Sequence, residues 1–152
     1  MSDGRRHWLV TTSEENYATT ARRRFTLQGF KARHRRAVER MRPGDRLCWY
    51  VTRVAVFPAT ATVTSPAFED ATPLWRSEGR PDAYPWRVRL RPAVTVPRTR
   101  GVPAARLVPG MRFASRFPAP HWRLALQGQL REIPAADFAR VERALARAKE
   151  VA

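Results

Sequence analysis

The sequence predicts an α+β fold in which mainly antiparallel strands are flanked by helices. Apolar and polar residues alternate at 46–53, 59–64 and 86–91, which is the pattern of a strand with one buried face. Apolar residues recur at helical spacing in 32–41 and 137–149. The 152 residues, of which 43% are hydrophobic, suffice for one core, and no composition shift divides the chain. We therefore expect one domain over residues 1–152.

The first two elements are a strand and a helix. Residues 7–12 are β-branched and aromatic, which favours a strand. Ser13 follows as a helix N-cap, and Glu14 and Glu15 fall in the first helical turn, where carboxylates interact favourably with the helix dipole. The strand is therefore expected to lead directly into a capped helix.

The next segment joins this helix to a second one. Arginines at 22–24 place cations at the first helix C-terminus, and residues 25–30 are extended. Apolar residues at helical spacing continue from 32 to 41, and the Pro-Gly-Asp turn at 43–45 ends the helix. Basic side chains crowd the start of this helix, although its dipole disfavours cations, and this placement suggests a polyanionic partner.

Strands occupy the centre of the chain. The alternating segments 46–53 and 59–64 indicate half-buried antiparallel strands. Residues 65–85 contain four prolines and are expected to form a long ordered loop. At 86–91 apolar residues alternate with arginines, which predicts a strand with one apolar and one basic face.

The last third of the chain has less regular structure until its end. Residues 92–120 contain six prolines, and we expect little there beyond a helical turn at 104–107. A short strand is predicted at 121–126. Pro134 is a start signal for the final amphipathic helix. The apolar stripe of that helix consists of Phe138, Val141 and Leu145.

The charge balance indicates a polyanionic partner. The chain has 29 Lys+Arg against 13 Asp+Glu, a net charge of +16 and a pI near 11.7, and so basic a protein accumulates near nucleic acids. An arginine-rich solvated surface that only reflects composition is the alternative. No run approaches the roughly 18 to 20 apolar residues of a membrane span, and no signal peptide is apparent. We expect a cytoplasmic protein without membrane contact.

Few residues of the chain are typical of catalytic or metal sites. His7, His34 and His121 are far apart, and the seven glycines are scattered singly, so neither a metal site nor a phosphate-binding glycine loop is expected. Cys48 lies in the middle of a strand, where a buried structural thiol is expected. The carboxylates show no neighbouring histidine for acid–base catalysis. We expect no enzymatic activity, no metal and no cofactor.

Aromatic residues are interleaved with basic and amide side chains along the chain. Aromatic faces stack on bases with about 1 to 3 kcal/mol each, and arginines add phosphate contacts. Tryptophans at alternating strand positions also pack in cores, and we assign at least half of the aromatic residues to packing. Both interpretations remain open for Trp49, Trp86 and Trp122.

Five segments together carry a resemblance to a known family. In chain order they are His7 to Tyr17, Gln28 to Lys31 with His34, Met41 to Arg46 leading to Tyr50, Tyr84 to Val88, and His121 to Gly128 followed by Glu132 to Pro134. The chain resembles the EVE-domain family of the PUA-like superfamily, which is related to YTH and ASCH domains, over roughly residues 7–148. This resemblance implies a PUA-like pseudo-barrel of mixed, mainly antiparallel strands flanked by helices. It also implies a pocket for a modified base of DNA or RNA.

The same resemblance implies which residues surround the base. Gln28 stands where many relatives carry a tryptophan, so that an amide hydrogen bond replaces stacking at this position. The expected base-binding residues are Ser13, Asn16, Gln28, Gly29, Phe30, Lys31, Trp49, Tyr50, Trp86 and Trp122. The expected phosphate-binding residues are Arg33, Arg35, Arg36, Arg87, Arg89 and Arg91.

The expected function is a non-enzymatic nucleic-acid-binding module that reads a modified base in an aromatic and amide pocket. A small-molecule or nucleotide sensor using the same pocket is the alternative, and an enzyme acting on RNA or a modified nucleoside is a third. Salt dependence separates the first two, because phosphate contacts weaken steeply with salt whereas the binding of a neutral ligand does not. DNA or RNA, the modification, the strand context and the oligomeric state stay open.

Overall fold

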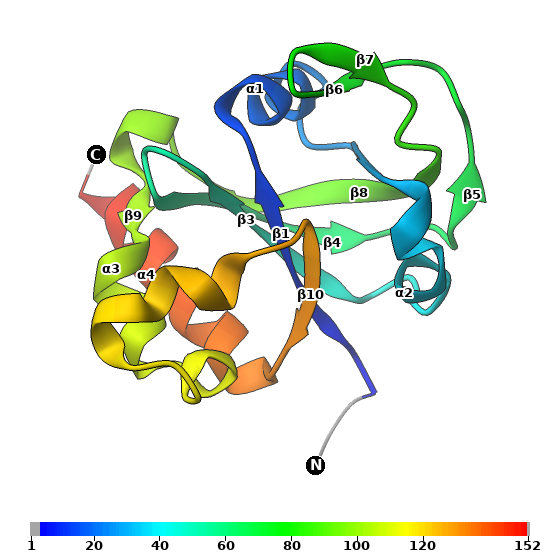
Figure 1. Cartoon of the computed structure of the whole chain (residues 1–152). Helices are drawn as coiled ribbons and strands as arrows, with labels where there is room; N and C mark the ends of the chain where they lie inside the picture. Colours follow the sequence, from blue (N-terminus) through cyan, green and yellow to red (C-terminus); the bar gives the residue numbers. More distant parts are fainter. Residues whose placement is uncertain (1–3, 152) are drawn as a thin grey trace.

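The central sheet has eight strands and bends into a curled, barrel-like shape (Figure 1). In the computed structural model, which describes residues 4–151, six strands follow one another in the order β10, β1, β3, β4, β8 and β2. Their bounds are β1 (His7–Thr12), β2 (Leu27–Phe30), β3 (Arg46–Val51), β4 (Val56–Val63), β8 (Trp86–Thr95) and β10 (Leu130–Ile133). β1 and β3 run parallel, and the other neighbours along this order are antiparallel. The predicted mixed, mainly antiparallel fold is confirmed.

The remaining strands are short. β5 (Phe68–Glu69) pairs with β8, and β9 (Val102–Pro103) pairs with β4. β6 (Trp75–Ser77) and β7 (Arg80–Asp82) form a separate hairpin. This hairpin lies beside α1 (Glu14–Arg22) at the top of Figure 1. The proline-containing loop predicted at 65–85 therefore contains three short strands.

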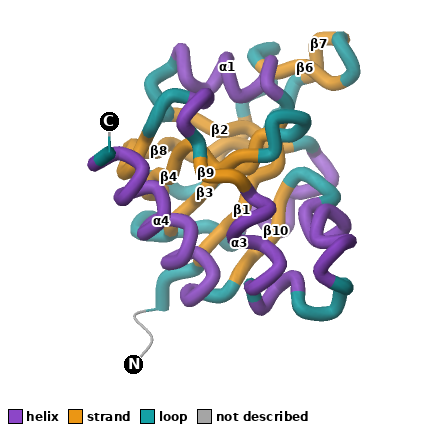
Figure 2. The backbone as a smooth tube through the Cα atoms, turned by 90° about the vertical axis from the view of Figure 1, so that its left-hand side faces the viewer, coloured by secondary structure: helices purple, strands orange, loops and turns teal. Residues whose placement is uncertain are grey.

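Helices cover both sides of the sheet. α1 and α2 (Arg35–Glu39) lie on one side, and α3 (Ala104–Leu107) and α4 (Ala135–Glu150) lie on the other, which faces the viewer in Figure 2. Five short 3₁₀ helices complete the described chain. They are η1 (Ala32–His34), η2 (Arg98–Arg100), η3 (Val108–Gly110), η4 (Arg112–Ala114) and η5 (Ala119–Leu126).

Two apolar cores occupy the two faces of the sheet. Because successive residues of a strand point to opposite faces, Trp8 and Trp49 join the core under α1 and α2, whereas Leu9 and Cys48 join the core under α4. The predicted apolar stripe of α4 closes the second core with Phe138, Val141 and Leu145. Cys48 is fully buried there, as expected for a structural thiol.

Two predictions about strands are wrong. Residues 47–51 of β3 and 57–61 of β4 are buried on both faces rather than one, because helices cover each face of the sheet. Residues 121–126 belong to the 3₁₀ helix η5 and not to a strand. Proline, which cannot donate a ladder hydrogen bond, stands at 118 and 120 and favours this helical start.

Neither a membrane helix nor a metal cluster occurs in the described part of the chain. Between residues 4 and 151, no helix is both long and apolar enough to cross a bilayer. Over the same residues, no three His, Cys, Asp or Glu side chains gather as they would around a metal ion.

Candidate functional site

A polar cavity of about 250 Å³ opens where β1 ends and α1 begins. Its walls come from the β1–α1 junction, β2, the β6–β7 hairpin and the turn at 128–129 before β10. Hydroxyl, amide and cationic side chains dominate the lining, beside the rings of Trp75 and Tyr84. Pockets for drug-sized ligands usually measure roughly 300 to 1,000 Å³, so this polar cavity suits a ligand of about one aromatic ring system.

The floor of the polar cavity is a buried hydrogen-bond network around Gln28. The Gln28 Oε1 atom accepts hydrogen bonds from Trp49 Nε1 at 2.7 Å and from the Thr20 hydroxyl at 3.4 Å. The Thr20 hydroxyl in turn accepts a hydrogen bond from Trp75 Nε1 at 3.0 Å. Gln28 and Trp49 are 2% and 0% exposed. The network therefore fixes both tryptophans relative to β2.

Trp75 and Tyr84 form an aromatic wall of the polar cavity. Their rings meet edge to face with centroids 6.0 Å apart, and the chain of β2 passes against the Trp75 ring at Gly29. A side chain at position 29 would occupy the place of this ring, so the glycine is required by a close approach rather than by a turn.

Arg87 supports this aromatic wall from within the protein. Its side chain is 1% exposed, and its guanidinium carbon lies 5.1 Å from the centre of the Trp75 ring. Burial lowers the pKa of Arg87, and the nearby Asp70 carboxylate, 3.6 Å away, opposes this shift. The guanidinium donates hydrogen bonds to the carbonyl oxygens of Thr72, Ala83 and Tyr84. Arg87 therefore holds the loop that carries both rings.

Asn16 fastens the β6–β7 hairpin to α1. Its Oδ1 atom accepts a hydrogen bond from the Arg76 backbone N–H at 2.7 Å, and its Nδ2 atom donates to the Arg76 carbonyl oxygen at 2.7 Å. This helix begins at the predicted cap, since the Ser13 hydroxyl accepts a hydrogen bond from the Asn16 N–H. Asn16 lines the polar cavity, and both atoms of its amide already have partners in the hairpin.

Replacing Asn16 with alanine is expected to loosen the hairpin. The variant loses both hydrogen bonds to Arg76, each with a net value of about 0.5 to 1.5 kcal/mol. Hydrogen exchange at the Arg76 amide is expected to accelerate by about tenfold or more. Thr19→Ala is the control, because it changes a half-buried threonine of the same helix whose hydroxyl bonds to Glu15 and Arg22 of that helix and not to the hairpin. Equal exchange rates of the Arg76 amide in the two variants would show that Asn16 does not fasten the hairpin to α1.

Cations surround the mouth of the polar cavity. The Lys31 Nζ atom donates a hydrogen bond to the Ser77 hydroxyl at 2.8 Å and lies 5.8 Å from the Tyr84 ring centre. Arg33 is exposed at the same mouth and donates a hydrogen bond from Nε to His34 Nε2. Partial burial, followed by the charges of Arg33 and Lys31, lowers the pKa of His34. His34 is therefore neutral at neutral pH and can accept this hydrogen bond.

The structure brings together part of the expected base site. Ser13, Asn16, Gln28 and Lys31 line the polar cavity. Gly29 and Trp49 lie directly behind the lining, in contact with Trp75 and Gln28 respectively.

The other expected aromatic walls lie elsewhere. Phe30 is fully buried in the core under α1 and α2, and Tyr50 packs against Phe57 in the core under α4. Trp122, which lies in η5, also belongs to this second core. Trp86 is half-buried on β8, beneath the guanidinium of Arg35 at 4.7 Å. The structure thus places these four aromatic residues outside the lining of the polar cavity.

The expected phosphate contacts are also divided. Arg33 lies at the mouth of the polar cavity, and Arg36 is exposed next to it on α2. Arg35 is exposed as well and pairs with Glu39 at 3.3 Å. Arg89 and Arg91 are exposed on β8. The prediction of an exposed basic face that includes Arg87 is wrong, because β5 and the loop at 70–84 cover this residue.

Several lining residues were not predicted from the sequence. They are Thr11, Thr12, Trp75, Arg76, Ser77, Glu78, Tyr84, Gly128 and Gln129. One signal was present in the sequence, namely a tryptophan and a tyrosine inside the loop at 65–85, where apolar rings need a partner. The helix to which this segment is hydrogen-bonded, α1, lies about 60 residues earlier in the chain.

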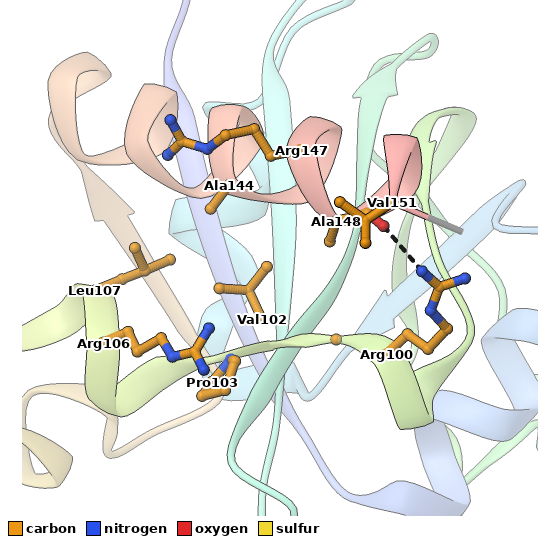
Figure 3. Close-up of a pocket in the computed structure, with 10 residues that line it drawn as sticks. Arg100, Val102, Pro103, Arg106, Leu107, Ala144, Arg147, Ala148 and Val151 are labelled. Carbon is orange, nitrogen blue, oxygen red and sulfur yellow. Dashed lines mark hydrogen bonds between the residues drawn. The ribbon is translucent and has the colours of Figure 1, made fainter.

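A larger groove of about 470 Å³ lies between α4 and β9 (Figure 3). It is lined by apolar side chains such as Val102 and Leu107 and bordered by Arg100, Arg106 and Arg147. Arg100 donates a hydrogen bond to the Ala148 carbonyl oxygen at 3.2 Å. The described side chains of this groove offer donors and no acceptor, whereas the edge of a base presents both donors and acceptors. The polar cavity is therefore the better candidate for base recognition.

Comparisons with known proteins agree with this fold. The chain matches the EVE domain over residues 6–144, and it belongs to the EVE-domain family. It is similar to a UPF0310 protein of Pyrococcus abyssi, with 26% identity over 145 residues that cover 90% of this chain and 96% of that protein.

Solved structures with a similar fold include YTH domains. The YTH domain of the Zygosaccharomyces rouxii MRB1 protein, in complex with N6-methyladenosine RNA, matches with a TM-score of 0.66 and 18% identity over 95% of this chain and 89% of that one. The Pho92 YTH domain in complex with m6A matches with a TM-score of 0.63 and 13% identity over 95% of this chain and 88% of that one. At these identities the likeness concerns the fold.

Proposed function

We propose that this chain is a non-enzymatic nucleic-acid-binding module that holds one modified base of DNA or RNA in the polar cavity. The observation that carries this proposal is a base-sized cavity with an amide floor, an aromatic wall and cations at its mouth. The YTH domains of similar fold, whose solved complexes contain N6-methyladenosine, support it at the level of the fold.

The energetics of such a site follow from its parts. Extruding a base costs a few kcal/mol, and a pocket recovers this through stacking and through hydrogen bonds to the exposed edge of the base. Trp75 and Tyr84, which are 1% and 5% exposed, supply an apolar wall rather than an open stacking face. The hydroxyls at 11–13 supply donors and acceptors. The Gln129 amide already accepts a hydrogen bond from the Lys31 N–H and donates one to the Gly29 carbonyl oxygen. Lys31 and Arg33, which also line the cavity, are cations that can pair with the phosphates of the bound strand.

The lining supports binding rather than chemistry. Of the described residues that line the polar cavity, only Glu78 carries a carboxylate, and none is a histidine or a cysteine. General acid–base catalysis needs a positioned proton donor and acceptor in reach of the substrate. The proposal therefore assigns no reaction to this cavity.

A binding screen tests the proposal directly. Modified and unmodified oligonucleotides, single-stranded and duplex, are compared at two salt concentrations, with N6-methyladenosine and 5-methylcytosine as the first modifications. We expect a modified strand to bind tighter than its unmodified counterpart, with affinity that falls as salt rises. Tight, salt-independent binding of a free nucleoside without any preference for a strand would instead support a small-molecule sensor.

The exposed arginines near the cavity mouth give a second prediction. Replacing Arg33, Arg35 and Arg36 together with glutamine is expected to weaken binding to all sequences alike. The slope of log affinity against log salt is expected to fall by roughly 0.7 to 0.9 for each phosphate that the variant no longer neutralises. The control removes the same charge from the other side of the sheet, at Arg106, Arg143 and Arg147, which are also exposed. Equal slopes for both triple variants would mean that residues 33–36 form only a solvated surface.

A further inference from the structure

A second cavity of about 410 Å³ adjoins the polar cavity. Thr11 and Gly128 line both cavities, so the two share an edge at the end of β1 and the turn before β10. Gly128 has a φ of +86°, and nothing lies within 4 Å of the position where its Cβ atom would be. The backbone at this shared edge is therefore open toward solvent, and a ligand can extend from one cavity into the other.

The adjoining cavity has the chemistry of a phosphate and sugar site. Two guanidinium groups, of Arg53 and Arg123, stand beside hydroxyls of Thr52 and Tyr50. Guanidinium and hydroxyl groups are the usual partners of phosphate and sugar oxygens in nucleic-acid complexes. None of the described residues that line this cavity is acidic. A bound anionic group therefore meets no negatively charged side chain among these lining residues.

The two arginines differ in how firmly the protein holds them. Arg53 is exposed in the turn between β3 and β4. Arg123 is exposed in η5, and its guanidinium lies 4.5 Å from the Trp122 ring centre, which restrains its direction. Burial raises the pKa of Tyr50, so its hydroxyl stays protonated and can donate a hydrogen bond. The tyrosine ring itself is 5% exposed and packs in the core, so it offers no stacking surface.

We propose that the adjoining cavity binds the phosphate and sugar of the nucleotide next to the base held in the polar cavity, with Arg53 and Arg123 as its phosphate-binding residues. This inference rests on the proposed function and deepens it, because it makes a dinucleotide the unit of recognition. The lining contains donors for a backbone but no free aromatic face, so the neighbouring base is not stacked in this cavity.

Short ligands test this inference. The probes are N6-methyladenosine and 5-methyldeoxycytidine, each as a nucleoside and as dinucleotides extended on the 5′ or the 3′ side. In the unchanged protein, one of the two extensions is expected to bind at least about tenfold tighter than the nucleoside, as a charged hydrogen bond requires. In the Arg53→Gln, Arg123→Gln variant, that gain is expected to vanish while nucleoside affinity is retained. Arg106→Gln with Arg147→Gln is the control of equal charge.

Each outcome bears on one of the two proposals. A dinucleotide that binds no tighter than its nucleoside, or a gain that survives in the Arg53 and Arg123 variant, overturns the dinucleotide site and leaves the proposed function standing. If the tighter binding of the dinucleotide is lost equally in the control variant, it reflects net charge, and this result also overturns the dinucleotide site. If neither these probes nor any modified strand of the oligonucleotide screen binds, the proposed function fails, and the dinucleotide site fails with it.

Discussion

An alanine at Gly29 is expected to displace the aromatic wall of the polar cavity and to destabilise the protein. A Cβ atom at this position would lie 2.4 Å from Cζ3 of Trp75 and 2.9 Å from the carbonyl oxygen of Tyr84. Overpacking of this kind costs about 1 to 3 kcal/mol. A glycine to alanine change otherwise stabilises by about 0.4 to 1 kcal/mol through the unfolded chain, so the steric term prevails.

Chemical unfolding and ligand binding measure the two consequences separately. We expect a lower free energy of unfolding for Gly29→Ala and a loss of affinity for the strand that binds in the screen. Gly110→Ala is the matched control, because the nearest atoms to its Cβ would be at the end of the flexible Arg140 side chain, 2.7 Å away. A Gly29→Ala protein as stable as this control, with unchanged binding, would show that the Trp75 ring moves freely and forms no wall.

The strands and helices were largely predictable because each follows from local patterns. The cap at Ser13, the strand at 7–12 and the final helix with its buried Phe138 and Leu145 depend on residues close in sequence. Burial of both faces of β3 was not predictable in this way. Alternate residues of β3 pack into two different cores, one on each face of the sheet. The helices that cover these faces are distant in sequence, and the pattern of the strand does not reveal them.

Arg87 illustrates the same limit in the candidate site. In sequence it is equivalent to Arg89, since both alternate with apolar residues of β8. In the structure Arg89 is exposed, whereas Arg87 is covered by the loop at 70–84, whose carbonyl oxygens replace water as its partners. A buried guanidinium of this kind requires acceptors fixed by tertiary structure, and local periodicity contains no information about them.

The polar cavity was predictable only at the start of the first helix and in and just after β2. Asn16 and Gln28 were identified through the family resemblance, and both lie at the cavity. Their partners Arg76 and Trp49 are 60 and 21 residues away in sequence. Asn16 and Gln28 were expected to contact the base through their amides. The structure shows that both amides already make hydrogen bonds within the protein, so we assign them mainly to positioning the hairpin and the tryptophans.

Replacing Gln28 with leucine is expected to destabilise the protein through an unsatisfied donor. Leucine has no acceptor, so Trp49 Nε1, buried and hydrogen-bonded to Gln28 at 2.7 Å, loses its partner. An unpaired buried polar group costs about 1 to 3 kcal/mol. Chemical unfolding is expected to show this loss for Gln28→Leu. Gln127→Leu, which changes an exposed amide, is expected to leave the free energy of unfolding nearly unchanged.

A double-mutant cycle with Trp49→Phe separates this hydrogen bond from packing. The phenylalanine variant alone leaves a cavity and removes one donor from Gln28, so it is destabilised as well. In the Gln28→Leu, Trp49→Phe protein neither an orphaned donor nor an orphaned acceptor remains between these two positions. Its destabilisation is therefore expected to be smaller than the sum of the single variants, by about 0.5 to 3 kcal/mol. Strict additivity would mean that water or Thr20 satisfies each group when the other is absent, and that the floor of the cavity is held by packing alone.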